Sequence, residues 1–189
     1  MKNVPKQTGE IFETLSKGQF ICADSTSDNT RRLYNIIEDC YDPLYEHFET
    51  INLKLQAGEN YFHFTRKESK VDLERKIEIA FRWIDFLDFL KTFENSFGPG
   101  FRFTPYEIMV KLNVDAILKS KVEGLKKHTK DESIQNSIQK VIDTLAKDNF
   151  IELENEISMT YKVLASFKYL EDLVLKINIP DEVRNEIPE

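Results

Sequence analysis

The stretch "INLKLQAGENYFHFTRK", residues 51–67, decides how the first third of this 189-residue chain is interpreted. Hydrophobic residues occupy every second position on both sides of a turn at 57–60. They are Ile51, Leu53 and Leu55 before the turn, and Phe62 and Phe64 after it. Alternation with a period of two around a turn that contains Gly and Asn is typical of a β-hairpin. The sequence therefore predicts a hairpin in a chain whose other segments mostly have helical spacing.

The segments before this hairpin predict a helix, a short strand and two more helices. Residues 8–16 have helical spacing with Thr8 as the expected N-cap, and residues 18–24 are expected to include a short strand. Residues 28–41 place hydrophobic side chains at helical spacing after a cluster of Ser, Asp, Asn and Thr. Pro43 is expected to break or kink that helix, and a second short helix follows it.

A long helix is predicted at 71–93, where the sequence is "VDLERKIEIAFRWIDFLDFLKTF". Its hydrophobic residues form two stripes, which leaves little of its surface for solvent and indicates a helix covered on more than one side. The stripes are Leu73, Ile77, Phe81, Ile84 and Leu87, and Ile79, Trp83, Phe86, Leu90 and Phe93. We expect a connector between two domains or against a partner subunit. The Gly/Pro-rich "SFGPG" at 96–100 predicts the domain boundary.

The order of elements repeats after this boundary. The sequence predicts a strand at 101–103, helices at 105–113, 114–128 and 133–148, a hairpin at 150–161 and a last helix at 163–177. Thr104 is the expected N-cap of the first of these helices, with Pro105 at its first position. The helix at 133–148 has one hydrophobic face, made by Ile134, Ile138, Val141, Ile142 and Leu145.

A strand, two or three helices and a final hairpin, present twice, is the element order of a winged helix-turn-helix. We therefore predict an α+β fold, mainly α with small β-hairpins, in which two tandem winged-helix domains are joined by a long apolar helix. The predicted divisions are an N-terminal winged-helix domain at 1–70, a connector helix at 71–97, a C-terminal winged-helix domain at 98–178 and an acidic tail at 179–189.

Composition narrows the class of protein. Hydrophobic residues make up 41% of the chain, which suffices for packed cores, and the net charge of −7 argues against a protein that coats nucleic acid non-specifically. Two cysteines, Cys22 and Cys40, predict no disulfide framework. The N-terminus lacks the apolar region of a signal peptide, and no stretch of 18 uncharged apolar residues occurs. We therefore expect a soluble, cytoplasmic protein that is not in a membrane.

A cluster of basic residues departs from this acidic background. Between 117 and 130 lie Lys119, Lys121, Lys126, Lys127, Lys130 and His128, against a single acid, Glu123. One hypothesis is contact with DNA phosphates, and the alternative is a solvated helix end, where lysines are favourable near the C-terminus. The helix at 133–148 adds Gln139 and Lys140 as candidate DNA contacts, but Asp143 and Asp148 offset its lysines. This face suits backbone contact or a protein interface better than base reading.

Three phenylalanines bracket the boundary at 96–100, where a polar loop is usual. Phe97, Phe101 and Phe103 are expected either to pack into the second domain or to form part of a partner-binding or self-binding patch.

The residue types that carry catalysis do not combine into a site. Cys22, Cys40, His47 and His63 lack the spacing of a zinc site. His63 alternates with Phe62 and Phe64, which predicts a solvated histidine on the opposite face of the hairpin. Asp85 and Asp88 are three residues apart on the long helix, where solvation or a salt bridge is the expected role. The sequence contains no phosphate-binding glycine motif. We expect no catalytic residues, no metal and no cofactor.

The chain resembles the MukE/MksE group of bacterial condensin accessory subunits over roughly residues 8–178. The resemblance lies in the order of elements and in the segments "LSKGQF", "YFHF", the aromatic connector and "LAKDNFIEL". The resemblance implies a non-enzymatic, nucleoid-associated subunit, often a homodimer, that binds a kleisin linking the heads of an SMC ATPase. It also implies DNA contact within a complex that organises chromosomal or plasmid DNA. The alternative from the residues is a free-standing winged-helix transcription regulator. Charge on the helix at 133–148 distinguishes the two, because a regulator alone should bind a defined duplex tightly.

Overall fold

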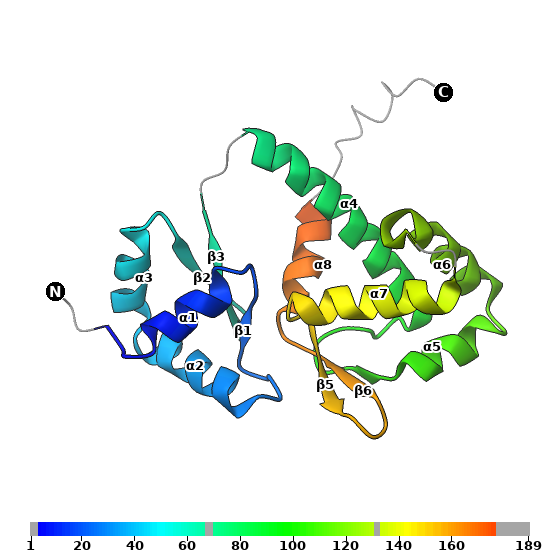
Figure 1. Cartoon of the computed structure of the whole chain (residues 1–189), viewed down its shortest axis with the longest axis horizontal. Helices are drawn as coiled ribbons and strands as arrows, with labels where there is room; N and C mark the ends of the chain where they lie inside the picture. The colour runs from blue at the N-terminus through cyan, green and yellow to red at the C-terminus, as the bar shows by residue number, and fades with distance from the viewer. Residues whose placement is uncertain (1–3, 67–69, 131–132, 177–189) are drawn as a thin grey trace.

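The computed structural model describes residues 4–66, 70–130 and 133–176, and for residues 70–78 and Lys176 it describes the backbone alone. The described residues form eight helices and two antiparallel three-stranded sheets, an α+β fold. We refer to residues 4–66 as the N-terminal module and to residues 70–176 as the C-terminal module. The two lie beside each other, each with its own small sheet (Figure 1).

The N-terminal module contains three helices followed by the hairpin that the sequence predicts. Its elements are α1 (Thr8–Leu15), β1 (Ile21–Cys22), α2 (Asp28–Asp39), α3 (Tyr41–Glu49), β2 (Lys54–Gly58) and β3 (Tyr61–Thr65). The sheet order is β1-β3-β2, so the first strand pairs with the last. Gly58 lies opposite Tyr61, and the Tyr61 ring occupies the place that a side chain at position 58 would need.

One local prediction for this module is wrong. Thr8 is not the N-cap of α1: it lies inside the helix, and its hydroxyl donates to the carbonyl of Pro5. The predicted interruption near Pro43 is present, because α2 ends at Asp39 and α3 begins at Tyr41. Pro43 lies in the first turn of α3, where its missing N–H costs no helical hydrogen bond. The capping cluster before α2 is confirmed, because the side chain of Ser27 accepts from the N–H of Thr30.

The C-terminal module repeats the sheet with an additional helix. Its elements are α4 (Lys70–Phe93), β4 (Arg102–Phe103), α5 (Pro105–Leu112), α6 (Ala116–Thr129), α7 (Ile134–Lys147), β5 (Ile151–Asn155), β6 (Thr160–Val163) and α8 (Phe167–Lys176). The sheet order is β4-β6-β5, the same order as in the first sheet. The predicted cap of α5 is confirmed, because Thr104 and Glu107 form a capping box with Pro105 at the helix start. The second hairpin is also confirmed.

The long helix α4 has the predicted length but is not apolar throughout. Phe81 is half exposed, and Asp85 and Asp88 lie on the side that faces α6. Among its described side chains, the buried ones are Ala80, Trp83, Phe86, Leu87, Phe89, Leu90 and Phe93, and all of these except Ala80 belong to the core of the C-terminal module. The prediction of a long apolar helix is therefore wrong in that respect. Leu73 and Ile77 of the first predicted stripe lie outside the described side chains.

Two hydrophobic cores organise the chain. One consists of residues from α1, α2, α3 and the first sheet, including Ile37, Leu44 and Phe48. The other is centred on α4, α6, α7 and α8, and it also takes in Phe20, Cys22 and Tyr61 from the N-terminal module. The cores thus meet across the first sheet. The proposed domain divisions at residues 70, 97 and 178 remain a prediction, and the tail at 179–189 lies outside the described residues.

Candidate partner- and DNA-binding surfaces

The lysine cluster predicted from the sequence lies along α6. Asp115 caps the start of this helix by accepting from the N–H of Leu118, which fixes where the helix begins. Its buried face consists of Leu118, Val122, Leu125 and Thr129. This face turns the lysines outward. Lys119 and Lys130 are exposed, and Lys130 is the C-cap residue, with a left-handed backbone at φ 53°.

Carboxylates neutralise much of this cluster. Lys121 lies 2.6 Å from Asp88, Lys127 lies 2.7 Å from Asp85, and Lys126 lies 2.6 Å from Glu123. Five lysines against these three carboxylates leave a local charge of +2. The sequence count of five lysines against Glu123 alone would leave +4, so α4 removes half of the expected excess. Surface pairs of this kind contribute roughly 0–1 kcal/mol, so a phosphate can displace them.

Asp85 is the centre of the contact between α4 and α6. The Nε2 of His128 lies 2.5 Å from the same carboxylate oxygen that pairs with Lys127. Partial burial raises the pKa of Asp85, but hydrogen bonds from Lys127 and His128 and their charge outweigh burial and hold that pKa below its usual value. The expectation that Asp85 and Asp88 form salt bridges is confirmed.

The exposed face of α7 is occupied by contacts within the chain. Its N-cap, Ser133, accepts from the N–H of Asn136. Gln139 donates from Nε2 to Asp143 at 2.8 Å, and Lys140 donates from Nζ to the carbonyl of Thr129 at 2.8 Å. Each of these hydrogen bonds uses one donor of the side chain and holds it against the chain's own atoms. Their role in DNA binding stays a prediction.

The three phenylalanines around the 96–100 turn have different surroundings. Phe97 and Phe103 are 0% and 1% exposed, and their rings lie 5.1 Å apart in the C-terminal core. They therefore fit the expectation of packing into the second module, and their side chains are not available to a partner in this structure. Phe101 is half buried and lies 5.3 Å from the Phe97 ring. It alone keeps surface that could belong to an interface.

A polar contact between the modules has no counterpart in the sequence predictions. Glu152 on β5 accepts from the hydroxyl of Ser25 at 2.7 Å and from the backbone N–H of Thr26 at 2.6 Å. Asp24 accepts from the N–H of Ala165 at 3.0 Å and lies 3.6 Å from Lys162. We call these residues the inter-module clasp. The polar residues at 24–28 have the composition of an ordinary helix-capping loop, so the sequence does not indicate that they contact the other module.

The first sheet is covered on its second face as well. The His63 ring lies 5.5 Å from Phe20 and 5.1 Å from Tyr169 of α8. Phe20 in turn lies 5.1 Å from Phe150. The prediction of a solvated histidine at position 63 is wrong, because α8 covers the face that the alternation assigns to solvent.

An exposed apolar strip runs from α5 into α6. Tyr106, Val110, Val114 and Ile117 are 75%, 47%, 86% and 67% exposed. We call these four residues the α5–α6 strip. Their spacing of four, four and three residues is visible in the sequence and could have been recognised there. The strip borders a hollow of about 440 Å³ that Met109, Leu112, Val114, Lys119 and Ile134 help to line.

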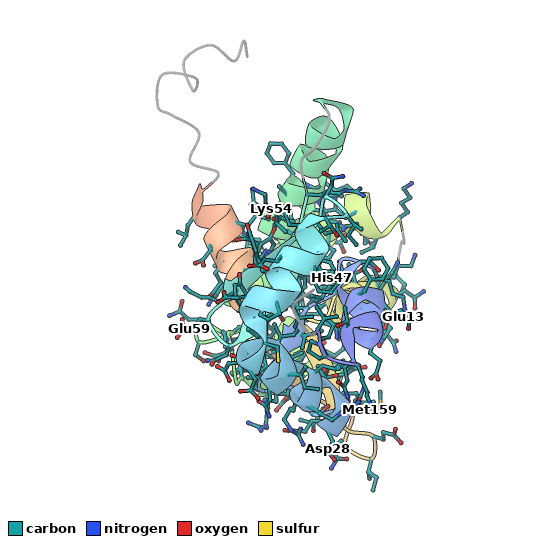
Figure 2. All side chains as sticks on the ribbon, turned by 90° about the vertical axis from the view of Figure 1, so that its left-hand side faces the viewer. Glu13, Asp28, His47, Lys54, Glu59 and Met159 are labelled. Carbon is teal, nitrogen blue, oxygen red and sulfur yellow. The ribbon has the colours of Figure 1, made fainter. Side chains whose placement is uncertain are left out.

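Figure 2 shows the molecule from the side of the N-terminal module, with Asp28 at the start of α2 and Met159 on the second hairpin at the same end. The tip of that hairpin is apolar and acidic. Ile157 is 98% exposed and Met159 is 45% exposed. A wing that contacts phosphates normally presents lysine or arginine, so this tip does not favour DNA contact.

The described residues contain no arrangement that points to catalysis. Burial raises the pKa of the Cys22 thiol to about 12, which makes it a poor nucleophile. No group of three or more His, Cys, Asp or Glu side chains in the described ranges could hold a metal ion. Among the described residues, no helix has the length and hydrophobicity needed to cross a membrane.

The surfaces available for contact with other macromolecules are thus the charged face of α6 and the exposed α5–α6 strip. Residues 6–174 match the family described as condensin complex protein MksE, and the chain belongs to this family. It is therefore a subunit of a condensin-type complex that associates with other condensin subunits. No curated protein matches the sequence.

Proposed function

We propose that this chain is a non-enzymatic accessory subunit that binds the kleisin of an SMC-type condensin and adds weak DNA affinity to the assembled complex. In this proposal the subunit is a homodimer in the cytoplasm, associated with the nucleoid. ATP hydrolysis belongs to the SMC partner. The complex organises chromosomal or plasmid DNA. Membership of the MksE family supports the assembly role.

The observation that carries the proposal is the repeated sheet order. In each module a helix and a single strand precede further helices and a hairpin, and the single strand pairs with the second hairpin strand. This is the order of a winged helix, and we propose that both modules are of this class. Winged helices serve as DNA readers and as protein-binding modules, so the exposed side chains decide between these roles.

Side chains on the helix before each hairpin argue against base reading. The outer face of α3 carries Asp42, Glu46 and Glu49, which would repel phosphate. On α7, Gln139 and Lys140 are held by Asp143 and by the Thr129 carbonyl. The lysines of α6 are the remaining candidates for DNA contact, with a local excess of +2 after pairing. This supports weak, backbone-directed binding that depends on partners.

Salt dependence measures how many of these lysines take part. If all five lysines meet phosphate, log affinity falls against log salt with a slope of roughly −4 to −5. If only Lys119 and Lys130 do, because the other three stay paired, the slope is about −2. A slope near zero for the assembled complex would remove DNA contact by α6 from the proposal.

The second candidate, a free-standing transcription regulator, is separated by a mobility-shift assay on the isolated full chain. We expect no sequence-selective shift at nanomolar protein. Tight, selective binding of one duplex would favour the regulator instead.

Kleisin binding is tested by co-expressing the full chain with the kleisin and the SMC head domain of the same condensin. We expect a complex with the kleisin that survives size-exclusion chromatography. If the chain elutes alone at micromolar concentrations of both proteins, the proposed function is wrong.

A further inference from the structure

A cavity of about 350 Å³ lies where the two modules meet. Its wall is formed by residues 18–20 and β3 of the N-terminal module, and by α4, α8 and the turn after α7 of the C-terminal module. Ligand pockets of proteins commonly have volumes of about 300–1,000 Å³, mostly apolar walls and a position at a domain interface. This cavity has all three properties, and neither the lysine cluster nor the α5–α6 strip contributes to it.

Aromatic side chains that pack against one another form much of this wall. The Phe20 ring lies 5.1 Å from the Phe150 ring and 5.2 Å from the Tyr169 ring. The Trp83 ring lies 5.2 Å from the Phe150 ring and meets it edge-on. Because these contacts hold the rings in place, the wall is preformed. Aromatic rings pack well against apolar groups and also attract cations to their faces.

One carboxylate contributes to the same wall. Among the described residues that line the cavity, only Asp148 has a carboxylate side chain. No described residue donates a hydrogen bond to this carboxylate or forms an ion pair with it, and partial burial raises its pKa. The charges of Arg82 and Lys147 oppose this rise, but both residues line a separate hollow of about 240 Å³. A cation that enters the cavity therefore gives Asp148 a partner that the described chain does not supply.

The end of α7 adds negative potential at this place. Asp148 is the C-cap residue of α7, and the last carbonyl groups of a helix carry a partial negative charge. The carbonyl of Lys147 accepts a hydrogen bond from Nε2 of Gln19 at 3.0 Å, which ties this helix end to the N-terminal module. Because a carboxylate and a helix C-terminus both favour cations, a ligand should carry its positive charge beside Asp148.

Other classes of occupant fit the cavity less well. An anion would approach both Asp148 and the helix end. A metal ion needs several ligands, and no group of three or more His, Cys, Asp or Glu side chains in the described ranges could hold one. A wholly apolar molecule would leave the carboxylate unpaired. Because segments of both modules surround the cavity, it encloses its occupant, which suits a small molecule better than a protein surface.

We propose that this cavity binds a small organic amine, with an aromatic or branched aliphatic body against Phe20, Trp83 and Phe150 and an ammonium group beside Asp148. This inference goes beyond the proposed function, because it requires neither the kleisin nor DNA. A ligand in this position contacts both modules, so its binding stabilises the joint between them.

The test uses the fluorescence of Trp83, because this residue is the only tryptophan of the chain and lines the cavity. The full chain is titrated with phenethylammonium chloride. We expect a saturable change with a Kd of about 1 mM or tighter, as for a ligand of this size. Hydrocinnamate has the same phenylethyl group with a carboxylate in place of the ammonium, and it should bind at least about tenfold more weakly. At about ten times its Kd, phenethylammonium should raise the melting temperature by about 3–6 °C.

The Asp148→Asn variant removes the charge and keeps the shape of the side chain. It should bind phenethylammonium about tenfold or more weakly and lose the preference over hydrocinnamate. Its melting temperature should stay within about 2 °C of wild type, because no described residue pairs with the carboxylate. The matched control is Asp143→Asn on α7, an exposed residue that lines the separate hollow instead. It should bind phenethylammonium within about twofold of wild type.

The assignment is wrong if phenethylammonium causes no saturable change, if the wild type binds both probes equally, or if Asp148→Asn binds phenethylammonium as the wild type does. N-acetyllysine amide is a further probe, because it presents an ammonium group as a peptide would. Tighter binding of this probe than of phenethylammonium would assign the cavity to a lysine of a protein partner and overturn the proposal of a small amine. Weaker binding of it supports the small amine.

Discussion

The two hairpins have the same position in the same sheet order, but their surroundings differ. The hairpin of β2 and β3 is enclosed by its own core through Leu55 and Phe62 and by α8 through His63 and Tyr169. The hairpin of β5 and β6 ends in a tip where Ile157 is 98% exposed. Both hairpins therefore take part in the joint between modules, the first through His63 and the second through Glu152 of the clasp, and the second also has an exposed apolar tip. A shared topology does not imply a shared role.

The exposed faces of the helices also differ in charge between the two modules. The outer face of α3 in the N-terminal module is acidic, and the lysines of α6 are on the C-terminal module. If DNA contact occurs, we expect it on the C-terminal module, with the N-terminal module held in place by the inter-module clasp. Each of the following predictions asks whether this division of roles is correct.

The largest expected effect is the loss of stability when a phenylalanine is removed from either core. Phe48 and Phe97 are 1% and 0% exposed and belong to different hydrophobic clusters. Replacing either by Ala should lower the free energy of unfolding by about 3–5 kcal/mol, because each leaves a cavity. Calorimetry should show one transition for both variants, since the second core takes in Phe20, Cys22 and Tyr61 of the N-terminal module. Two separate transitions, with only one shifted in each variant, would show that the modules are independent.

The clasp should have the next largest effect. Glu152→Ala leaves the Ser25 hydroxyl, which is 2% exposed, and the Thr26 N–H without their acceptor. The expected cost is about 1–3 kcal/mol, with faster hydrogen exchange of the backbone at 19–27. The matched control is Glu154→Ala on the same strand, where the pair with Arg102 is exposed. It should change neither quantity measurably, and equal effects of the two variants would mean that the clasp contributes nothing specific.

The lysine cluster should matter for DNA and not for stability. Replacing Lys126, Lys127 and Lys130 by Glu should weaken DNA retention of the assembled complex about tenfold or more at low salt without unfolding the protein. The control is the same triple reversal at Lys6, Lys17 and Lys54, which are exposed on the N-terminal module. Filter binding of the two complexes should separate them. An equal loss for both would indicate a general charge effect instead of a site.

The smallest expected effect is a dependence of stability on pH. Because Lys127 and His128 hold the pKa of Asp85 below its usual value, the contact stabilises the fold above the unfolded pKa of about 4. This stabilisation is lost as the pH falls through the lower folded value. Asp85→Asn should therefore cost at most about 1 kcal/mol at pH 7, since the site is partly exposed, and less at pH 3. Urea unfolding at the two pH values measures the difference, and an equal cost at both would contradict the role of the carboxylate charge.

Local features of the fold could be predicted from the sequence, and contacts between distant segments could not. The alternation around 57–60, the capping box at Thr104 and the apolar face of α7 are short-range patterns, and the structure contains all three. Thr8 is not the cap because α1 begins one residue earlier than predicted, with Gln7 at the N-cap position and Thr8 already in the helix. His63 failed because period-two alternation shows which face a residue is on, but not whether a distant helix covers that face.

For the candidate surfaces, too, local patterns could be predicted from the sequence and contacts between distant segments could not. The position of the lysines on α6 could be predicted, but their neutralisation by Asp85 and Asp88 depends on how α4 packs against α6. The clasp joins residues more than 120 positions apart, so no local pattern reveals it. The α5–α6 strip was visible as a spacing, although only the structure shows that its side chains are exposed and not buried.

The most direct test of the account is the affinity of the purified full chain for the kleisin subunit, measured by isothermal titration calorimetry and compared with its affinity for duplex DNA. The account predicts a stoichiometric complex with the kleisin, with a Kd in the micromolar range or tighter, and weak, sequence-independent binding of DNA by the chain alone. No heat of binding with the kleisin, together with nanomolar binding of one particular duplex, would contradict it.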